Sequence, residues 1–127
     1  LLGSLNGVFY TDASTSKPTW ANYLAASNTA TDIVGFVSDD PYERFEIQSA
    51  GTVAQTNIGN TAAVVLGAGV TPNFISKAEI SGTMATTANQ LKIIGVSKDP
   101  ENNELGAANA NVVVIISEHQ LKENTGY

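Results

Sequence analysis

The chain has 127 residues, of which 43% are hydrophobic and 14% are charged, and its formal net charge is -6. This length fits one domain with a buried core, and the hydrophobic content excludes a disordered polypeptide. The net charge argues against nucleic acid and anionic membrane surfaces as partners, because both are bound by clustered Lys and Arg. The six basic residues are scattered along the chain: Lys17, Arg44, Lys77, Lys92, Lys98 and Lys122.

Cysteine is absent, which excludes disulfides, thiol catalysis and cysteine zinc sites. No apolar run approaches the roughly 18 residues of a membrane span. The charged content is well below the roughly 25% of an average soluble domain, and neutral polar residues take its place. We therefore expect much of the surface to pack against other protein. Because the chain begins at Leu1 without Met, we expect either processing or further residues ahead of it.

Residues 1–31 are predicted to form a mostly irregular N-terminal arm with a strand at Gly7–Thr11. Within this arm, "PTWANYLAAS" (18–27) is the best helical candidate of the chain. Pro18 suits a first helical turn, and Trp20, Tyr23 and Leu24 are spaced i, i+3, i+4. The segment is also compatible with an extended arm, and both alternatives stay open.

Residues 32–127 are predicted to form a small antiparallel β-barrel or sandwich, which gives one compact all-β domain overall. The strand at Arg44–Ser49 alternates apolar and polar side chains, as a half-buried strand does. The runs Ala62–Leu66 and Asn111–Ser117 are continuously apolar, so we expect both of their faces to be covered. The remaining predicted strands of this domain are Asp32–Ser38, Lys77–Ser81 and Leu91–Ser97, and Gly-, Asn-, Thr- and Ser-rich loops connect them.

The stretch "VVLGAGVTP" (64–72) imitates the glycine turn of a dinucleotide-binding fingerprint. Its context does not fit, because Pro72 stands where the third glycine belongs and the following residues alternate like a strand. No acidic residue stands about twenty positions further on. The sequence therefore favours a Gly-rich loop between two strands over a nucleotide site.

Two acidic stretches nearly repeat each other, "VSDDPYE" (37–43) and "VSKDPEN" (96–102). Asp40 and Asp99 could act as an acid–base pair or bind a cation through these loops. The simpler interpretation is two turns that end strands, because proline cannot donate to a β-ladder and Asp and Ser bond nearby backbone N–H groups. Gly35 and Gly95, inside the preceding apolar runs, indicate bulges or tight bends.

His119 is the only histidine, so a zinc site would need carboxylates alone around it. Ser117 stands two residues away, but no Gly-x-Ser-x-Gly motif accompanies it. We expect a surface histidine at a strand end. The sequence predicts no catalytic residue, no metal site and no cofactor.

Two long segments, "NGVFYTDASTSKPTWANYLAASNTATDIVGFVSDDPYERFEIQ" and "LKIIGVSKDPENNELGAANANVVVIISEHQ", resemble small capsid-associated proteins of marine tailed bacteriophages. The resemblance rests on three blocks in fixed order: "FYTD", "DDP…FEIQ" and "DPEN…ANVxVxIxxHQ". It covers nearly the whole chain, although residues 50–88 carry little of it.

The resemblance implies a capsid decoration (cement) protein: a non-enzymatic virion protein on the outer capsid surface that bridges and stabilises major capsid protein subunits. Self-association as a homotrimer is compatible with it. A head-fibre, vertex, or receptor- or carbohydrate-binding β module is the alternative, and an enzyme using Asp40 and Asp99 is a third hypothesis. Contacts with the capsid or a neighbouring subunit are expected from apolar and aromatic side chains near the N-terminus, which could equally be core: Leu1, Leu2, Leu5, Val8, Phe9, Tyr10, Trp20 and Tyr23.

Overall fold

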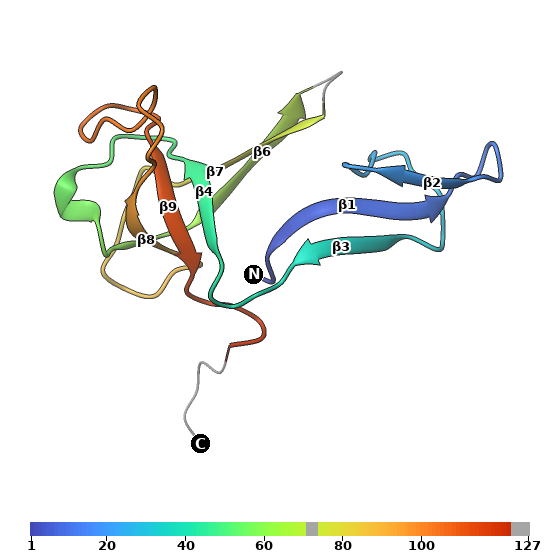
Figure 1. Cartoon of the computed structure of the whole chain (residues 1–127), viewed down its shortest axis with the longest axis horizontal. Helices are drawn as coiled ribbons and strands as arrows, with labels where there is room; N and C mark the ends of the chain where they lie inside the picture. Colours follow the sequence, from blue (N-terminus) through green and yellow to red (C-terminus); the bar gives the residue numbers. More distant parts are fainter. Residues whose placement is uncertain (71–73, 123–127) are drawn as a thin grey trace. The chain divides into compact units, whose positions relative to one another are not determined.

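The computed structural model describes residues 1–70 and 74–122, and in them the chain forms antiparallel β-sheets and no α-helix (Figure 1). The prediction of an all-β fold is confirmed. None of the three sheets is closed. The chain divides into two compact units. We call Leu2–Asp40 the N-terminal unit, and Pro41–Tyr127 together with Leu1 the C-terminal unit.

The N-terminal unit is a three-stranded sheet in the order β2-β1-β3, built from β1 (Ser4–Thr11), β2 (Pro18–Ala21) and β3 (Val34–Ser38). The predicted arm over residues 1–31 contains β1 and β2, which pair with each other, and most of its residues lie outside these strands. The division between the two units does not fall after residue 31 but after Asp40, because β3 pairs with β1. Pro18 begins a strand, not a helical turn, since at the edge of a sheet its missing N–H costs no ladder bond.

A bulge in β1 decides which side chains share a face of this sheet. Leu5 pairs with Val37 and Gly7 pairs with Phe36, so Asn6 is the extra residue. Because alternate residues point to opposite faces, the extra residue turns Leu5 to the face of Val37 and away from that of Gly7. The predicted bulge at Gly35 is thus misplaced: Gly35 itself pairs regularly with Val8, and the bulge lies on the neighbouring strand.

The C-terminal unit contains a four-stranded sheet in the order β4-β9-β8-β5 and a two-stranded ribbon, β6-β7. The strands of the four-stranded sheet are β4 (Arg44–Gln48), β9 (Asn111–Ile116), β8 (Leu91–Val96) and β5 (Thr61–Ala62). The ribbon consists of β6 (Val64–Val70) and β7 (Ile75–Ile80), and a single 3-10 turn, η1, spans Gln55–Asn57. In β8 the register shifts between Ile93 and Gly95, so a bulge lies directly beside the predicted glycine, with Ile94 as the extra residue.

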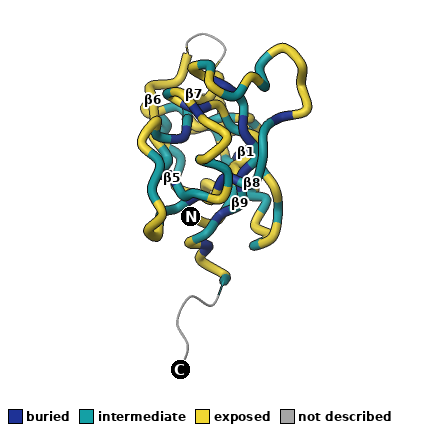
Figure 2. The backbone as a smooth tube through the Cα atoms, turned by 90° about the vertical axis from the view of Figure 1, so that its left-hand side faces the viewer, coloured by how far each residue is buried: buried dark blue, intermediate teal, exposed yellow. Residues whose placement is uncertain are grey.

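The core of the C-terminal unit lies against one face of β8 and β9 (Figure 2). Along β9, buried positions alternate with half-buried ones, so only one face of this strand is fully covered and the expectation of two covered faces is wrong. β4 alternates as predicted, with Phe45 and Ile47 packed against the core. The buried cluster comprises Val53, Ala62, Ile80, Leu91, Ile93, Val112, Val114 and Ile116.

The ribbon joins the four-stranded sheet at its base. Ser49, just after β4, forms a parallel bridge with Ile80, and the Ala50 N–H donates to the Ile80 carbonyl at 2.9 Å. Two glycines allow this approach: a Cβ on Gly51 would lie 2.9 Å from the Gly82 Cα. The two backbones therefore meet where neither has a side chain.

Beyond its base the ribbon is exposed, and Figure 2 shows β6 largely in yellow. Val65 is 45% exposed and Leu66 is 81% exposed. The expectation that Ala62–Leu66 is covered on both faces is therefore wrong for its second half. The predicted loop at 64–72 is also corrected up to Val70, because Gly67–Gly69 lie within β6, where a register shift interrupts the pairing; residues 71–73 lie outside the described residues.

Candidate functional site

One face of the N-terminal sheet is apolar and open. Phe9 pairs with Trp20 on one side and with Val34 on the other, and Phe36 follows two residues after Val34, so all four share a face. Their exposed fractions are 42% for Phe9, 54% for Trp20, 53% for Val34 and 47% for Phe36. We call these four side chains the aromatic face.

The aromatic face is ordered by ring packing over a glycine. The Trp20 and Phe36 rings are tilted at 56° with centroids 5.0 Å apart, a geometry that aromatic pairs favour. They meet above Gly7, where an added Cβ would lie 2.4 Å from Trp20 Cζ2. The large side chains of the aromatic face are thus packed against one another and still exposed to water. Exposed apolar patches of this kind often mark protein contact sites.

Charges of the N-terminal unit stand at the ends of its strands, not on the aromatic face. Asp12 follows β1, Asp32 precedes β3, and Lys17 precedes β2 at the same end of the sheet. Asp39 and Asp40 follow β3 at the opposite end. With four aspartates and one lysine, residues 2–40 carry an excess of negative charge around an uncharged centre.

Hydrogen bonds fix two of these carboxylates in their charged form. The Ser14 hydroxyl donates to Asp12 Oδ1 at 2.6 Å, and the Thr15 and Ser14 N–H groups also donate to it, which lowers the Asp12 pKa to about 2. The Thr11 hydroxyl donates to Asp32 Oδ2 at 2.6 Å and lowers the Asp32 pKa. Both groups cap strand ends, and they keep their negative charge at neutral pH.

The predicted interface residues divide between surface and interior. Leu2, Leu5, Phe9 and Trp20 are exposed, and Tyr10 and Tyr23 are half-buried. Val8 is 3% exposed, which places it inside the N-terminal unit and makes it unavailable for a surface contact.

Leu1 belongs to the C-terminal unit, although its side chain is exposed. The Gln120 N–H donates to the Leu1 carbonyl at 2.8 Å, and the Leu1 nitrogen donates to the Glu118 carbonyl at 3.0 Å. Its backbone is therefore held by the segment after β9.

Sequence reasoning missed Val34 and Phe36, half of the aromatic face. Asp32–Ser38 was assigned to the main β domain, where an apolar run is expected to be covered. The signal that was present is their i, i+2 spacing, which puts both side chains on one face of a strand. The identity of the neighbouring strand, and hence of the shared face, required the structure.

A second exposed apolar surface lies on the β6-β7 ribbon and extends over both of its faces, because neighbouring residues of a strand point to opposite sides. It includes Val65 and Leu66 on β6, Val70 at the strand's end, and Ile75 on the partner strand. β6 carries no charged residue along its length, whereas edge strands are commonly protected by charges or proline. The ribbon therefore offers apolar side chains and a β6 edge without such protection.

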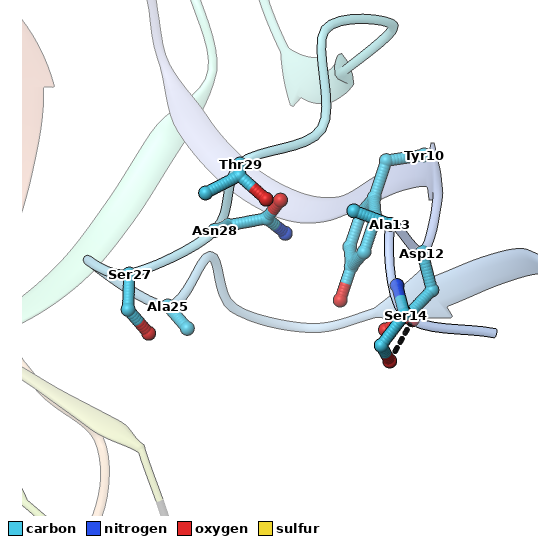
Figure 3. Close-up of a pocket in the computed structure, with 8 residues that line it drawn as sticks. All are labelled: Tyr10, Asp12, Ala13, Ser14, Ala25, Ser27, Asn28 and Thr29. Carbon is cyan, nitrogen blue, oxygen red and sulfur yellow. Dashed lines mark hydrogen bonds between the residues drawn. The ribbon is translucent and has the colours of Figure 1, made fainter. Parts of the chain in front are cut away.

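A polar hollow of about 430 Å³ opens on the N-terminal unit, lined by the end of β1, the residues after it and the loop 25–29 (Figure 3). Figure 3 shows Asn28 extending from the loop toward the Tyr10 ring, with Asp12 and Ser14 beyond that ring. The lining residues are Tyr10, Asp12, Ala13, Ser14, Ala25, Ser27, Asn28 and Thr29. We call this hollow the Tyr10 pocket. Tyr10 was predicted from sequence only as an interface residue.

The paired acidic stretches follow strand ends, as the turn interpretation predicts. After β8, the Asp99 N–H donates to Ser97 Oγ at 3.0 Å and the Glu101 N–H donates to Asp99 Oδ1 at 3.0 Å. At the last residue of β3, Ser38 Oγ accepts from Asn6 Nδ2 at 3.1 Å. Asp40 and Asp99 belong to different units. Within residues 1–70 and 74–122, no three His, Cys, Asp or Glu side chains are grouped to hold a metal ion.

His119 is buried, with 1% of its surface exposed, so the expectation of a surface histidine is wrong. It follows β9 closely, and its Nδ1 accepts the Leu121 N–H at 3.0 Å. Its Nε2 has no hydrogen-bond partner among the described residues. The turn after β9 thus places the imidazole in the interior.

Comparisons with known protein families, with curated proteins and with solved structures gave no match. Across the described part of the chain, no helix has the length and apolar character needed to span a membrane. The features of the described chain that bear on its function are the aromatic face, the β6-β7 ribbon and the Tyr10 pocket.

Proposed function

We propose that this protein is a structural, non-enzymatic protein of a tailed-bacteriophage virion, which binds the outer capsid surface and stabilises it by bridging major capsid protein subunits. The observation that carries the proposal is the aromatic face, an arranged and half-exposed set of large apolar side chains on a compact unit of its own. Its acidic surroundings fit a capsid surface that is apolar at the centre and basic at the rim. The sequence resemblance to capsid-associated proteins supplies the identity of the partner.

The energetics favour many weak contacts over one strong contact. Burying the exposed half of four large apolar side chains contributes roughly 3–6 kcal/mol, if a fully buried side chain contributes about 1.5–3 kcal/mol. Association costs an estimated 4–15 kcal/mol, so one aromatic face alone gives weak binding. A lattice that presents several sites at once raises the avidity, and a homotrimer would do so further. Binding only the assembled shell would stabilise that state by mass action.

The β6-β7 ribbon supplies a second contact that bridging requires. It belongs to the C-terminal unit, whereas the aromatic face belongs to the N-terminal unit, so one chain carries an apolar surface on each. An unprotected β6 edge can add to a neighbouring sheet through backbone hydrogen bonds. Two such surfaces on one chain are what a protein that links neighbouring capsid subunits needs.

The test is co-sedimentation of the full chain with purified expanded capsids. We expect a fixed, high copy number per major capsid subunit, and we expect the Trp20→Ala and Phe36→Ala variants to bind at least tenfold more weakly. Leu121→Ala is the matched control, because Leu121 is an exposed apolar residue of the C-terminal unit outside its strands. Absence of the protein from purified heads would refute the proposal. A few copies per particle would favour a head-fibre or vertex component instead.

A further inference from the structure

The Tyr10 pocket has no role in the contacts proposed above. Its residues come from the end of β1 and from the loop 25–29, and Tyr10 pairs with Thr19, so its side chain lies on the sheet face opposite to Phe9 and Trp20. The loop 25–29 is held in shape by local hydrogen bonds: the Asn28 N–H donates to the Ala25 carbonyl, and the Ala30 N–H donates to the side-chain Oδ1 of Asn28 at 2.8 Å. The pocket is therefore formed by strand and loop without any partner.

We propose that the Tyr10 pocket binds a neutral hexose, as a free sugar or as the end of a glycan. Its volume of about 430 Å³ lies within the range of small-molecule sites. Six of its eight lining residues carry a hydroxyl, carboxylate or amide group, and the other two are alanines that leave room. A ligand that satisfies these lining groups must itself carry many hydrogen-bond donors and acceptors.

The polar groups of the pocket have bonding capacity left over. Among the described residues, the Tyr10, Ser27 and Thr29 hydroxyls take part in no hydrogen bond, and neither does Asn28 Nδ2. All the bonds that Asp12 accepts on its side chain go to Oδ1, which leaves Oδ2 as an acceptor. A carboxylate and an amide beside hydroxyl groups can bond neighbouring sugar hydroxyls, which both donate and accept.

The charge of the pocket excludes the other common ligand classes. No Lys, Arg or His lines it, and Asp12 carries a negative charge, so phosphates, sulfates and carboxylates are repelled. One carboxylate is too few to hold a divalent cation against water. An apolar ligand would leave the hydroxyl and amide groups unpaired, which costs free energy at each of them. The Tyr10 ring supplies the one broad apolar surface, against which the C–H groups of a sugar ring can pack.

The test is a titration of the isotope-labelled full chain with glucose, galactose and mannose, followed by amide chemical shifts in NMR spectra. We expect at least one of the three hexoses to shift the amides of residues 10–14 and 25–29 in a saturable way. Ser27→Ala and Thr29→Val each remove a lining hydroxyl that bonds no described residue, and neither change touches the bond from the Ala30 N–H to Asn28 Oδ1. The double variant should bind the hexose roughly tenfold more weakly, because two hydrogen bonds are lost.

Thr31→Val is the matched control, because Thr31 is exposed and lies just outside the lining residues. It should leave the titration unchanged. If none of the three hexoses shifts those amides, or if the double variant responds like the unaltered chain, the proposal is wrong. The result is separable from capsid binding: Trp20→Ala should weaken capsid binding and leave the hexose titration intact, and the pocket variants should do the reverse.

Discussion

The two units differ in how they use their hydrophobic residues. The C-terminal unit buries a cluster that includes Val53, Ile80, Ile93, Val112 and Val114, whereas Val8 is the buried hydrophobic side chain of the N-terminal unit among the described residues. The N-terminal unit instead leaves its largest side chains half-exposed on the aromatic face. A three-stranded sheet with so small an interior is only marginally stable by itself. The C-terminal unit therefore uses its apolar residues to form a core, whereas the N-terminal unit presents its apolar residues at the surface.

The largest expected effect is the loss of a core side chain from the C-terminal unit. Ile93 is completely buried, so Ile93→Ala should lower the free energy of unfolding by about 2–5 kcal/mol through lost transfer energy and a residual cavity. Denaturant unfolding followed by far-UV circular dichroism measures it. Leu66→Ala, at an 81% exposed site of the same unit, should change stability by less than about 0.5 kcal/mol. Equal losses for the two variants would show that the ribbon is covered in solution.

A smaller effect is expected from Gly7→Ala in the N-terminal unit. The new methyl group would meet the Trp20 ring at 2.4 Å, so the ring must leave its place beside Phe36. We expect a loss of about 1–3 kcal/mol and a red shift of the fluorescence of Trp20, the sole tryptophan. Gly35→Ala is the control, because its nearest contact is the Leu5 side chain at 3.4 Å. An unchanged emission spectrum for Gly7→Ala would contradict the packing described for the aromatic face.

The smallest effect is a pH dependence of the N-terminal unit. Hydrogen bonds hold the folded-state pKa of Asp12 at about 2, below its ordinary value of 3.8, and they also lower the pKa of Asp32. Their stabilisation is therefore complete above about pH 4 and is lost as the pH falls toward 2. Amide chemical shifts of residues 11–16 between pH 5 and pH 2 should follow this loss, and Asp12→Asn should reduce it. A transition at the same pH in Asp12→Asn would assign the effect to other carboxyl groups.

Much of the strand content was predictable, because alternation and β-branched runs are local signals. Each of the seven predicted strands overlaps a strand of the structure, and the run Ala62–Leu66 spans parts of both β5 and β6. β2 was missed because Trp20, Tyr23 and Leu24 happen to match a helical spacing, while its pairing with β1 is a contact that local sequence does not encode.

The candidate sites were less predictable, because exposure depends on which strands become neighbours. Leu66 and Val114 look alike in sequence, as apolar residues inside apolar runs, yet one is exposed on the ribbon and the other is in the core. His119 looked like a surface residue because it follows a strand end, and the turn after β9 instead brings it inside. The Tyr10 pocket depends on the path of the loop 25–29, which has no periodic pattern.

The extra residue in β1 makes the surface of the N-terminal unit adjustable by a change of length alone. Inserting one residue into β3 between Phe36 and Val37, opposite Asn6, would restore the regular alternation and turn Leu5 and Val37 to the side of Phe9 and Trp20. The aromatic face would then gain two aliphatic side chains although no residue had been substituted. A single-codon insertion at this point can therefore change which side chains the sheet exposes on one face, while its hydrogen-bonded ladder beyond Gly7 stays as it is.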